Sequence, residues 1–349
     1  MALASYRQAP LSAKERQQRR RLLSMTFITC LVLVLIGSTI HVVMLGKLRL
    51  ADMRKLATYD LAEESAHERA AGEDITLQSN HEAGRAPNTG YTVVEAQRLV
   101  SREQWEELDS MVRIEAGTFV MGTNSERADT QDKPQHKVTL PTFYLDKYLV
   151  TNAQYARFVA ATKRRPPISW KDGHIPQGEL MNPVTMVSWN DAADYAAWAG
   201  KRLPHETEYE KAGRGSDARR WPWGDKMDPS RLNTYYNVGS PSNVTAYPKG
   251  ASVYGVYDLS GNVAEWTADD LRPYEGADAS WEVFGGNAAP TATKAAPIKL
   301  YKVLRGGSWK GDPFSTSLYH RDYALPDHAT DFYGFRCASD LERPVRAQP

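Results

Sequence analysis

The chain has 349 residues, 42% of them apolar and 24% charged, and a formal net charge of +1. These values are typical of a globular protein with a sizeable core, and the near-neutral charge gives no electrostatic basis for a nucleic-acid partner. Nine tryptophans and eighteen tyrosines occur among 24 glycines and 20 prolines. We therefore predict a domain rich in turns with aromatic packing, and not a helical bundle.

Cysteine is scarce: Cys30 lies inside an apolar run and Cys337 near the end of the chain. With a single cysteine in the globular part, no disulfide can form within it. Such a cysteine usually packs as a small hydrophobic side chain, so we expect Cys337 to be a buried and unreactive thiol.

Residues 24–46 contain no Lys, Arg, Asp or Glu. At ~1.5 Å per residue, a helix of this length covers the ~30 Å hydrocarbon core of a membrane. A cleaved signal peptide is the alternative, but the apolar run is longer than the usual ~7–15 residues and no small-x-small cleavage site follows it. We predict an uncleaved transmembrane anchor.

Basic residues set the predicted orientation of this anchor. Residues 1–23 carry six of them against a single acid, Glu15, whereas the residues after the span mix both signs. The positive-inside rule then places the N-terminus in the cytoplasm and the main domain outside it, in the periplasm if the host is a Gram-negative bacterium. Basic residues on both sides leave the opposite orientation open.

The pattern after the span divides the chain further. Apolar residues at helical spacing continue to about Ala71, a polar break follows, and one or two short amphipathic helices, with Ser101 as a cap, precede Met111. We expect these helices to pack on the domain, with partner binding as the alternative. The predicted organisation is a cytoplasmic basic tail at 1–23, a transmembrane helix at 24–46, a helical stalk and linker at 47–110, a folded domain at 111–342 and a tail at 343–349.

Within the domain, short alternating strands and two clear helices are predicted. The strands are 113–121 and 135–148, and the helices are 151–162 and 188–200. Thr151 or Asn152 caps the first helix, Ser188 or Asn190 caps the second, and Gly200 terminates it.

A turn entering a third helix follows directly. Pro204 suits the first turn of that helix, and Glu206, Glu208 and Glu210 enrich its beginning. We expect Glu208 to form a buried ion pair with Arg202, in a structural and not a catalytic role.

Seven sequence blocks occur in a set order over the domain. They are IEAGTFVMGT (114–123), HKVTLPTFYLDKYLVTNAQYARFV (136–159), PVTMVSWNDAADYAAWAGKRLPHETEYEKAGRG (183–215), WPWGD (221–225), YGVYDLSGNVAEW (254–266), VLRGGSW (303–309) and YGFRCA (333–338). In this order they resemble the formylglycine-generating, or sulfatase-modifying-factor, family. The resemblance implies an α+β fold with little regular secondary structure, related to C-type lectin-like domains.

The block YDLSGNVAEW places oxygen-bearing side chains on a tight turn, which suits a hard cation. The resemblance implies a calcium site here, with the side chains of Asp258 and Glu265 and the carbonyl oxygens of Gly261 and Val263 as ligands. The alternative is that these groups only satisfy the turn. A second family calcium site would involve Asn233 and Thr234, but the loop after them lacks the expected acid.

The loop after the RGGSW block departs from the family. Members that oxidise a cysteine to formylglycine carry two copper-binding cysteines there, and the matching positions are Gly311 and Thr316. Neither can supply the soft thiolate that copper(I) requires, so we expect no copper centre. Ser308 matches a serine near the family's substrate pocket, but no histidine in the sequence pattern is poised to activate it.

A replacement metal site is the open alternative. His320, His328 and Asp331 lie in one polar stretch, and two histidines with a carboxylate suit iron or another divalent metal. No HxxxH-like spacing places them on one helix face, so a solvated polar loop is the competing interpretation.

These observations predict a membrane-anchored, extracytoplasmic family member without formylglycine-generating activity. It would act as a binding, scaffold or maturation module for another extracytoplasmic or membrane protein. One alternative is an iron- or copper-dependent oxidoreductase with an altered active site. Another is a C-type-lectin-like module that binds a ligand on the surface formed by residues 309–331.

Overall fold

The computed structural model describes residues 59–60, 90–277, 301–342 and 344. The predicted cytoplasmic tail, the predicted transmembrane helix at 24–46 and Cys30 lie outside these residues. Within the described part, no helix has the length and apolar character needed to span a bilayer. The chain divides into two units, Met1–Leu56 and Ala57–Pro349, and the description below concerns the second.

This unit contains both helices and strands, which agrees with the predicted mixture of the two. The described helices are α3 (Val93–Leu99), α4 (Arg102–Leu108), α5 (Asn152–Thr162), α6 (Trp189–Trp198) and α7 (Glu206–Arg214). The described strands are β1 (Tyr59–Asp60), β2 (Met111–Ile114), β3 (Gly117–Met121), β4 (His136–Leu140), β5 (Phe143–Asp146), β6 (Ala264–Asp270), β7 (Lys302–Arg305), β8 (Arg321–Ala324), β9 (His328–Ala329), β10 (Tyr333–Gly334) and β11 (Ala338–Ser339).

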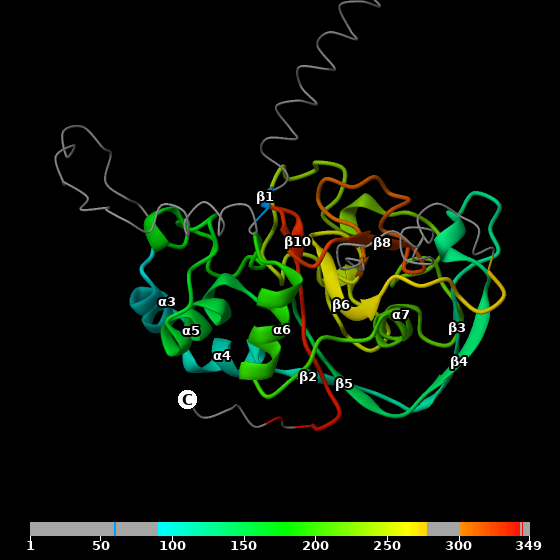
Figure 1. The fold of residues 1–349 in the computed structure, drawn as a ribbon, viewed down its shortest axis with the longest axis horizontal. Coiled ribbons are helices and arrows are strands. Elements are labelled where there is room, and N and C mark those ends of the chain that lie inside the picture. Colours follow the sequence, from blue (N-terminus) through cyan, green and yellow to red (C-terminus); the bar gives the residue numbers. More distant parts are fainter. Residues whose placement is uncertain (1–58, 61–89, 278–300, 343, 345–349) are drawn as a thin grey trace, which may run out of the picture. The chain divides into compact units, whose positions relative to one another are not determined.

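The strands form four small sheets. The largest has the order β10-β6-β7-β8, in which β10 is parallel to β6 and the other pairs are antiparallel. A second sheet has the order β11-β5-β2, and β3 with β4 and β1 with β9 form antiparallel pairs. Helices α3 to α6 gather on one side of the domain, and the four-stranded sheet with α7 on the other (Figure 1).

The predicted helix starts are confirmed. Thr151 caps α5 and Ser188 caps α6, each with a side chain three residues on that returns a hydrogen bond to the cap. The third helix also forms, but His205 is its N-cap and Pro204 precedes the cap instead of lying in the first turn. Glu208 accepts two hydrogen bonds of 2.7 Å from Arg202, so the predicted ion pair is present.

The two predicted long strands are each broken, so those predictions were wrong. The first divides into β2 and β3, because Gly117 adopts a φ of 146° where β3 begins. The second divides into β4 and β5 at Pro141, which has no N–H to donate to a sheet.

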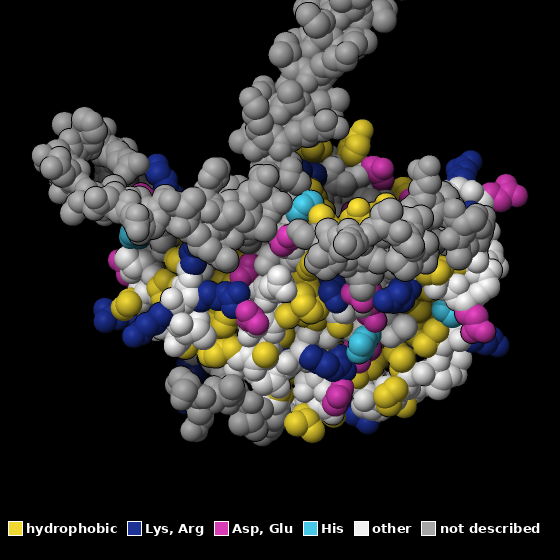
Figure 2. Space-filling view, viewed as in Figure 1, with side chains coloured by type: hydrophobic (Ala, Val, Ile, Leu, Met, Phe, Trp, Pro, Cys, Tyr) yellow, Lys and Arg dark blue, Asp and Glu magenta, His cyan; other side chains and the backbone are white. Residues whose placement is uncertain are grey.

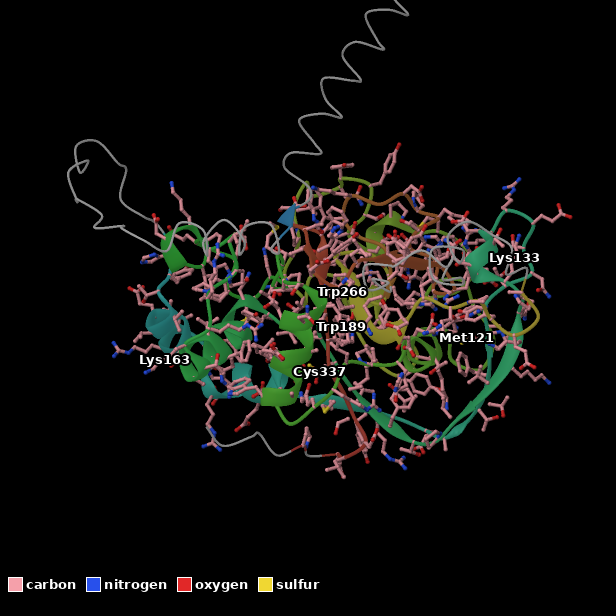
Figure 3. All side chains as sticks on the ribbon, in the orientation of Figure 1. Met121, Lys133, Lys163, Trp189, Trp266 and Cys337 are labelled. Atoms are coloured by element: carbon pink, nitrogen blue, oxygen red, sulfur yellow. The ribbon has the colours of Figure 1, made fainter. Side chains whose placement is uncertain are left out.

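The main core lies between α5, α6 and the four-stranded sheet. Tyr155 of α5 stacks on Tyr195 of α6 with ring centroids 5.7 Å apart. Trp266 is fully buried and donates a hydrogen bond to the carbonyl of Val187, beside Trp189 in the middle of the view in Figure 3. Cys337 is also fully buried, as expected, and burial raises the pKa of its thiol; an unreactive thiol stays a prediction.

Several ion pairs are buried in the domain. Arg336 binds both oxygens of Glu265, and Arg321 binds both oxygens of Glu206, at 2.6 to 2.8 Å. Arg305 pairs with Glu210. The first two pairs are planar and two-pronged, and such pairs fix both partners in orientation. On the surface in view, Lys and Arg are interspersed with Asp and Glu (Figure 2).

Candidate functional site

The loop 306–317 leaves β7 through two adjacent glycines. Gly306 and Gly307 have φ values of 91° and 65°. A Cβ on Gly306 would lie 2.4 Å from the hydroxyl of Tyr209, and one on Gly307 would lie 2.7 Å from the carbonyl oxygen of Ser315. Only glycine therefore allows this turn to pack so closely on the domain.

A second turn, residues 258–263, is hydrogen-bonded to this loop. The N–H of Gly261 donates to the carbonyl of Gly306 at 2.8 Å, and the N–H of Trp309 donates to the carbonyl of Asn262 at 2.9 Å. The hydroxyl of Ser260 donates to the carbonyl of Thr316 at 2.8 Å. The position of the loop thus depends on the predicted calcium turn.

The two positions that match the family's cysteines lie in this loop. Thr316 is fully buried, and its hydroxyl accepts from the indole of Trp221 at 3.1 Å and donates to the carbonyl of Pro313 at 2.8 Å. Gly311 has no side chain, and a Cβ there would lie 2.4 Å from the hydroxyl of Ser315. The loop is thus well ordered by polar contacts, but neither position offers a metal ligand.

Two consecutive tyrosines lie against the loop with a strained backbone. Tyr235 and Tyr236 have φ values of 49° and 59°, in the left-handed region that bulky residues rarely adopt, at a cost of about 1–3 kcal/mol each. Their N–H groups donate to the carbonyls of Gly311 and Trp309 at 2.9 and 2.7 Å. Both side chains remain open to solvent, with 68% and 47% of their surface exposed.

Arg220 borders the other end of the loop. Its guanidinium lies 4.4 Å from the ring centroid of Trp221, 5.5 Å from that of Phe314 and 5.8 Å from that of Tyr319. Its Nε–H donates to the hydroxyl of Ser317 at 2.8 Å. The tyrosines and this arginine therefore approach the same loop from its two ends.

The two acidic residues among the predicted calcium ligands differ in their surroundings. Asp258 is buried, and its carboxylate accepts a hydrogen bond from the side chain of Asn262 at 3.0 Å. Burial, with a smaller contribution from the charge of Glu265, raises the pKa of Asp258 to about 7. Glu265 is instead engaged by Arg336 and by the hydroxyl of Tyr209. Asp258 is thus a buried carboxyl short of positive charge, whereas Glu265 is already neutralised.

Asn233 lies directly beneath the same turn. Its amide nitrogen donates to the carbonyl of Ser240, and its backbone carbonyl accepts from the N–H of Asn262. Its side-chain oxygen is buried without a hydrogen-bond partner among the described residues. A Cβ on Gly261 would lie 2.5 Å from the backbone oxygen of Asn233, which explains the glycine in this turn.

The residues of the predicted replacement metal site are not brought together. Asp331 accepts from the ammonium of Lys310 at 2.7 Å, and His328 lies in β9. His320 instead groups with Asp129 and Asp132, and over the described ranges this is the one set of three such side chains whose ligand atoms lie within 4.8 Å of one another.

The residues that border the loop carry little signal in the sequence. Arg220 precedes the WPWGD block, and its position between aromatic residues was the one available signal. Nothing in the pattern around Tyr235 and Tyr236 indicates a left-handed backbone, because that conformation is imposed by their contacts with the loop.

Comparison with known proteins agrees with the mixed helix and strand fold. Residues 96–341 match the Sulfatase-modifying factor enzyme 1-like domain. The chain is 35% identical over 252 residues to the serine/threonine-protein kinase Pkn1 of Chlamydia trachomatis, which covers 67% of this chain and 39% of that protein. The chain thus spans about two fifths of the length of this relative. It is 32% identical to the inactive C-alpha-formylglycine-generating enzyme 2 of Bos taurus, over 69% of this chain and 93% of that protein.

A solved structure also resembles the domain. PvdO from Pseudomonas aeruginosa superposes with a TM-score of 0.54 at 27% identity, covering 74% of this chain and all of that chain. The match to the family begins at Ala96, within the segment predicted as linker.

Proposed function

Since the chain belongs to the Sulfatase-modifying factor enzyme 1-like domain family, we propose that its domain binds a segment of another protein at the loop 306–317 and does not oxidise it. The domain acts as a binding, scaffold or maturation module for an extracytoplasmic or membrane protein. Residues 24–46, which carry no charged side chain, anchor it to the membrane with the N-terminus in the cytoplasm. A relation of the fold to C-type lectin-like domains stays a prediction.

One observation carries the proposal. The loop keeps its glycine turn and its hydrogen bonds to the neighbouring turn, yet Gly311 has no side chain and the hydroxyl of Thr316 is committed to two hydrogen bonds. A loop retained without its redox ligands is suited to binding and not to oxidation. A relative at 32% identity is itself named an inactive formylglycine-generating enzyme.

An oxidation assay tests the negative half of the proposal. The full chain, purified in mild detergent and supplied with copper(I), should convert no cysteine in a synthetic sulfatase-type peptide to formylglycine, as measured by mass spectrometry. Gly311→Cys combined with Thr316→Cys is the matched variant, and it should bind copper(I) where the wild type does not. Conversion by the wild type would overturn the proposal.

Photocrosslinking tests the positive half. A photoreactive amino acid at Tyr235, which is 68% exposed beside the loop, should capture a partner protein in membranes of the host. The same amino acid at Val94 of α3, which is 55% exposed, is the control. Absence of a capture at Tyr235, or an equal capture at both positions, would contradict binding at the loop.

We also propose that calcium stabilises the turn 258–263. Asp258 fits a cation, because its carboxyl is buried and its pKa is raised to about 7. The carbonyl oxygens of Gly261 and Val263 complete the proposed set, and Glu265 is the weakest candidate since Arg336 already neutralises it. Calcium should raise the Tm of the wild type and leave that of Asp258→Asn unchanged, and an equal rise in both would refute the site.

The competing function is an oxidoreductase with a replacement iron or copper centre. The group of Asp129, Asp132 and His320 favours it, because these side chains could share a metal. However, His320 already pairs with Asp132 at 3.1 Å, and Asp132 accepts the N–H of Arg321 at 2.8 Å. Stoichiometric iron or copper in the purified protein, lost in His320→Ala and in Asp132→Ala, would replace the binding function by this one.

A further inference from the structure

Arg220 is held in one orientation by its neighbours. Its guanidinium lies 4.4 Å from the ring centroid of Trp221 and is flanked by Phe314 and Tyr319, while its Nε–H donates to Ser317. Arginine stacks on aromatic faces in this way because its charged group is planar. The side chain is half-buried, so little mobility remains to be lost when a ligand binds.

The two terminal nitrogens of Arg220 nevertheless have no hydrogen-bond or ion-pair partner within the described ranges. Its near neighbours differ: Arg219 pairs with Asp217, and Arg231 pairs with Asp228. Asp225 accepts the backbone N–H of Arg220 at 2.9 Å and forms no ion pair with its guanidinium. A fixed guanidinium with free terminal N–H groups matches the geometry of a carboxylate, which it can bind through two parallel hydrogen bonds.

The exposed tyrosines supply a second, independent feature at the other end of the same loop. Tyr235 and Tyr236 keep a left-handed backbone while their side chains face solvent, and strain of this kind clusters at functional sites. Tyrosine rings offer a large, rigid contact surface with little conformational entropy to lose. Lys310 does not compete with Arg220 for an acid, because Asp331 already pairs with it at 2.7 Å.

We propose that the domain recognises an acidic peptide segment of its partner. A carboxylate of that segment pairs with the terminal nitrogens of Arg220, and neighbouring side chains of the peptide pack on Tyr235 and Tyr236. This specificity rests on the proposed binding function of the loop. It further specifies that the ligand is negatively charged and that Arg220 recognises this charge.

A peptide array tests this specificity. The full chain in mild detergent is applied to matched pairs of short synthetic peptides and to sialylated glycans. One peptide of each pair carries Asp or Glu at the positions where the other carries Asn or Gln. The wild type should prefer the acidic peptides by about tenfold or more. Arg220→Gln should abolish the preference, and Arg220→Lys should keep only part of it because an ammonium cannot stack or form the two parallel bonds. Arg231→Gln is the matched control and should behave as the wild type.

The outcomes separate this inference from the binding function. Equal binding of acidic and amide peptides, or a preference that persists in Arg220→Gln, would overturn the role of Arg220, while a photocrosslinked partner at Tyr235 would leave the binding function intact. Binding of the sialylated glycans alone would replace the peptide by an acidic sugar and overturn the proposal. Absence of both peptide binding and a crosslinked partner would overturn the binding function as well.

Discussion

The contribution of His320 to the stability of the fold should depend on pH. Burial lowers its pKa, but the hydrogen bond and charge of Asp132, with Asp129 and Asp322 nearby, outweigh burial and raise it. A raised pKa means that the ion pair stabilises the fold fully below the unfolded pKa of about 6.5, and that this stability disappears as the pH rises through the folded pKa.

We therefore expect His320→Gln to lose about 1–3 kcal/mol of unfolding free energy in mildly acidic solution and much less in alkaline solution. Urea denaturation across this pH range measures the difference. In an Asp132→Asn background the pH dependence should largely vanish, and a loss that is independent of pH would refute the ion pair as its source.

Asp258 should also make the fold less stable as the pH rises, but because the fold favours its neutral form and not its charged form. Its pKa of about 7 is above that of an unfolded aspartate, so the fold favours the neutral carboxyl and stability falls as the pH rises from about 4 towards 7. Without divalent cations, Asp258→Asn should therefore be more stable than the wild type at alkaline pH, by on the order of 2–4 kcal/mol. Thermal unfolding with a chelator tests this, and a less stable variant under those conditions would contradict it.

The side chain of Tyr274 ends in a buried hydroxyl group. Among the described residues this hydroxyl has no hydrogen-bond partner, while the ring lies 4.2 Å from the guanidinium carbon of Arg321. Tyr274→Phe keeps the ring and removes an unsatisfied polar group, so it should leave stability unchanged or raise it by up to about 1 kcal/mol. A clear loss in denaturant unfolding would show that the hydroxyl has a partner, such as a buried water.

At the scale of elements, the strained backbone at Tyr235 and Tyr236 should lower the stability of the fold, while their side chains contribute to binding. Asparagine tolerates a left-handed backbone, and the ring of Tyr235 is largely exposed, so Tyr235→Asn should raise the unfolding free energy by about 0.5–1 kcal/mol while it weakens partner capture. Differential scanning calorimetry with the crosslinking assay tests both effects. A destabilised variant would show that the ring contributes to the fold.

Local signals explain which elements could be predicted from the sequence. Thr151 and Ser188 cap their helices by exchanging hydrogen bonds with the residue three positions later. These helix starts therefore depend only on interactions between residues close in the sequence. The breaks at Gly117 and Pro141 also have local causes, whereas the position of Arg220 depends on Phe314 and Tyr319, which are distant in the sequence. Thr316 and Gly311 could be identified by resemblance, but their hydrogen bonds to Trp221 and Thr234 come from distant segments.

At the scale of the whole molecule, α3 and α4 belong to the folded unit. Ala96 is fully buried, Val100 and Leu108 are nearly so, and the side chain of Gln154 donates to the carbonyl of Leu108. A chain that begins at Met111 should therefore be several kcal/mol less stable than one that begins at Gly90, at about 1.5–3 kcal/mol for each buried side chain that is lost. Comparison of the two Tm values tests this, and equal values would place both helices outside the cooperative unit.

The sheet β11-β5-β2 has a consequence for how the domain combines with other polypeptides. Arg113 of β2 and Ser339 of β11 both pair with Tyr144 of β5, so the two flanking strands lie about 10 Å apart, which is two strand spacings. The chain therefore enters this sheet through β2 and leaves it through β11 at nearby positions, which favours insertion of the sheet and what lies between these strands into a longer chain. The same geometry should tolerate a reporter protein fused after the last strand, which gives a direct route to imaging the protein in living cells.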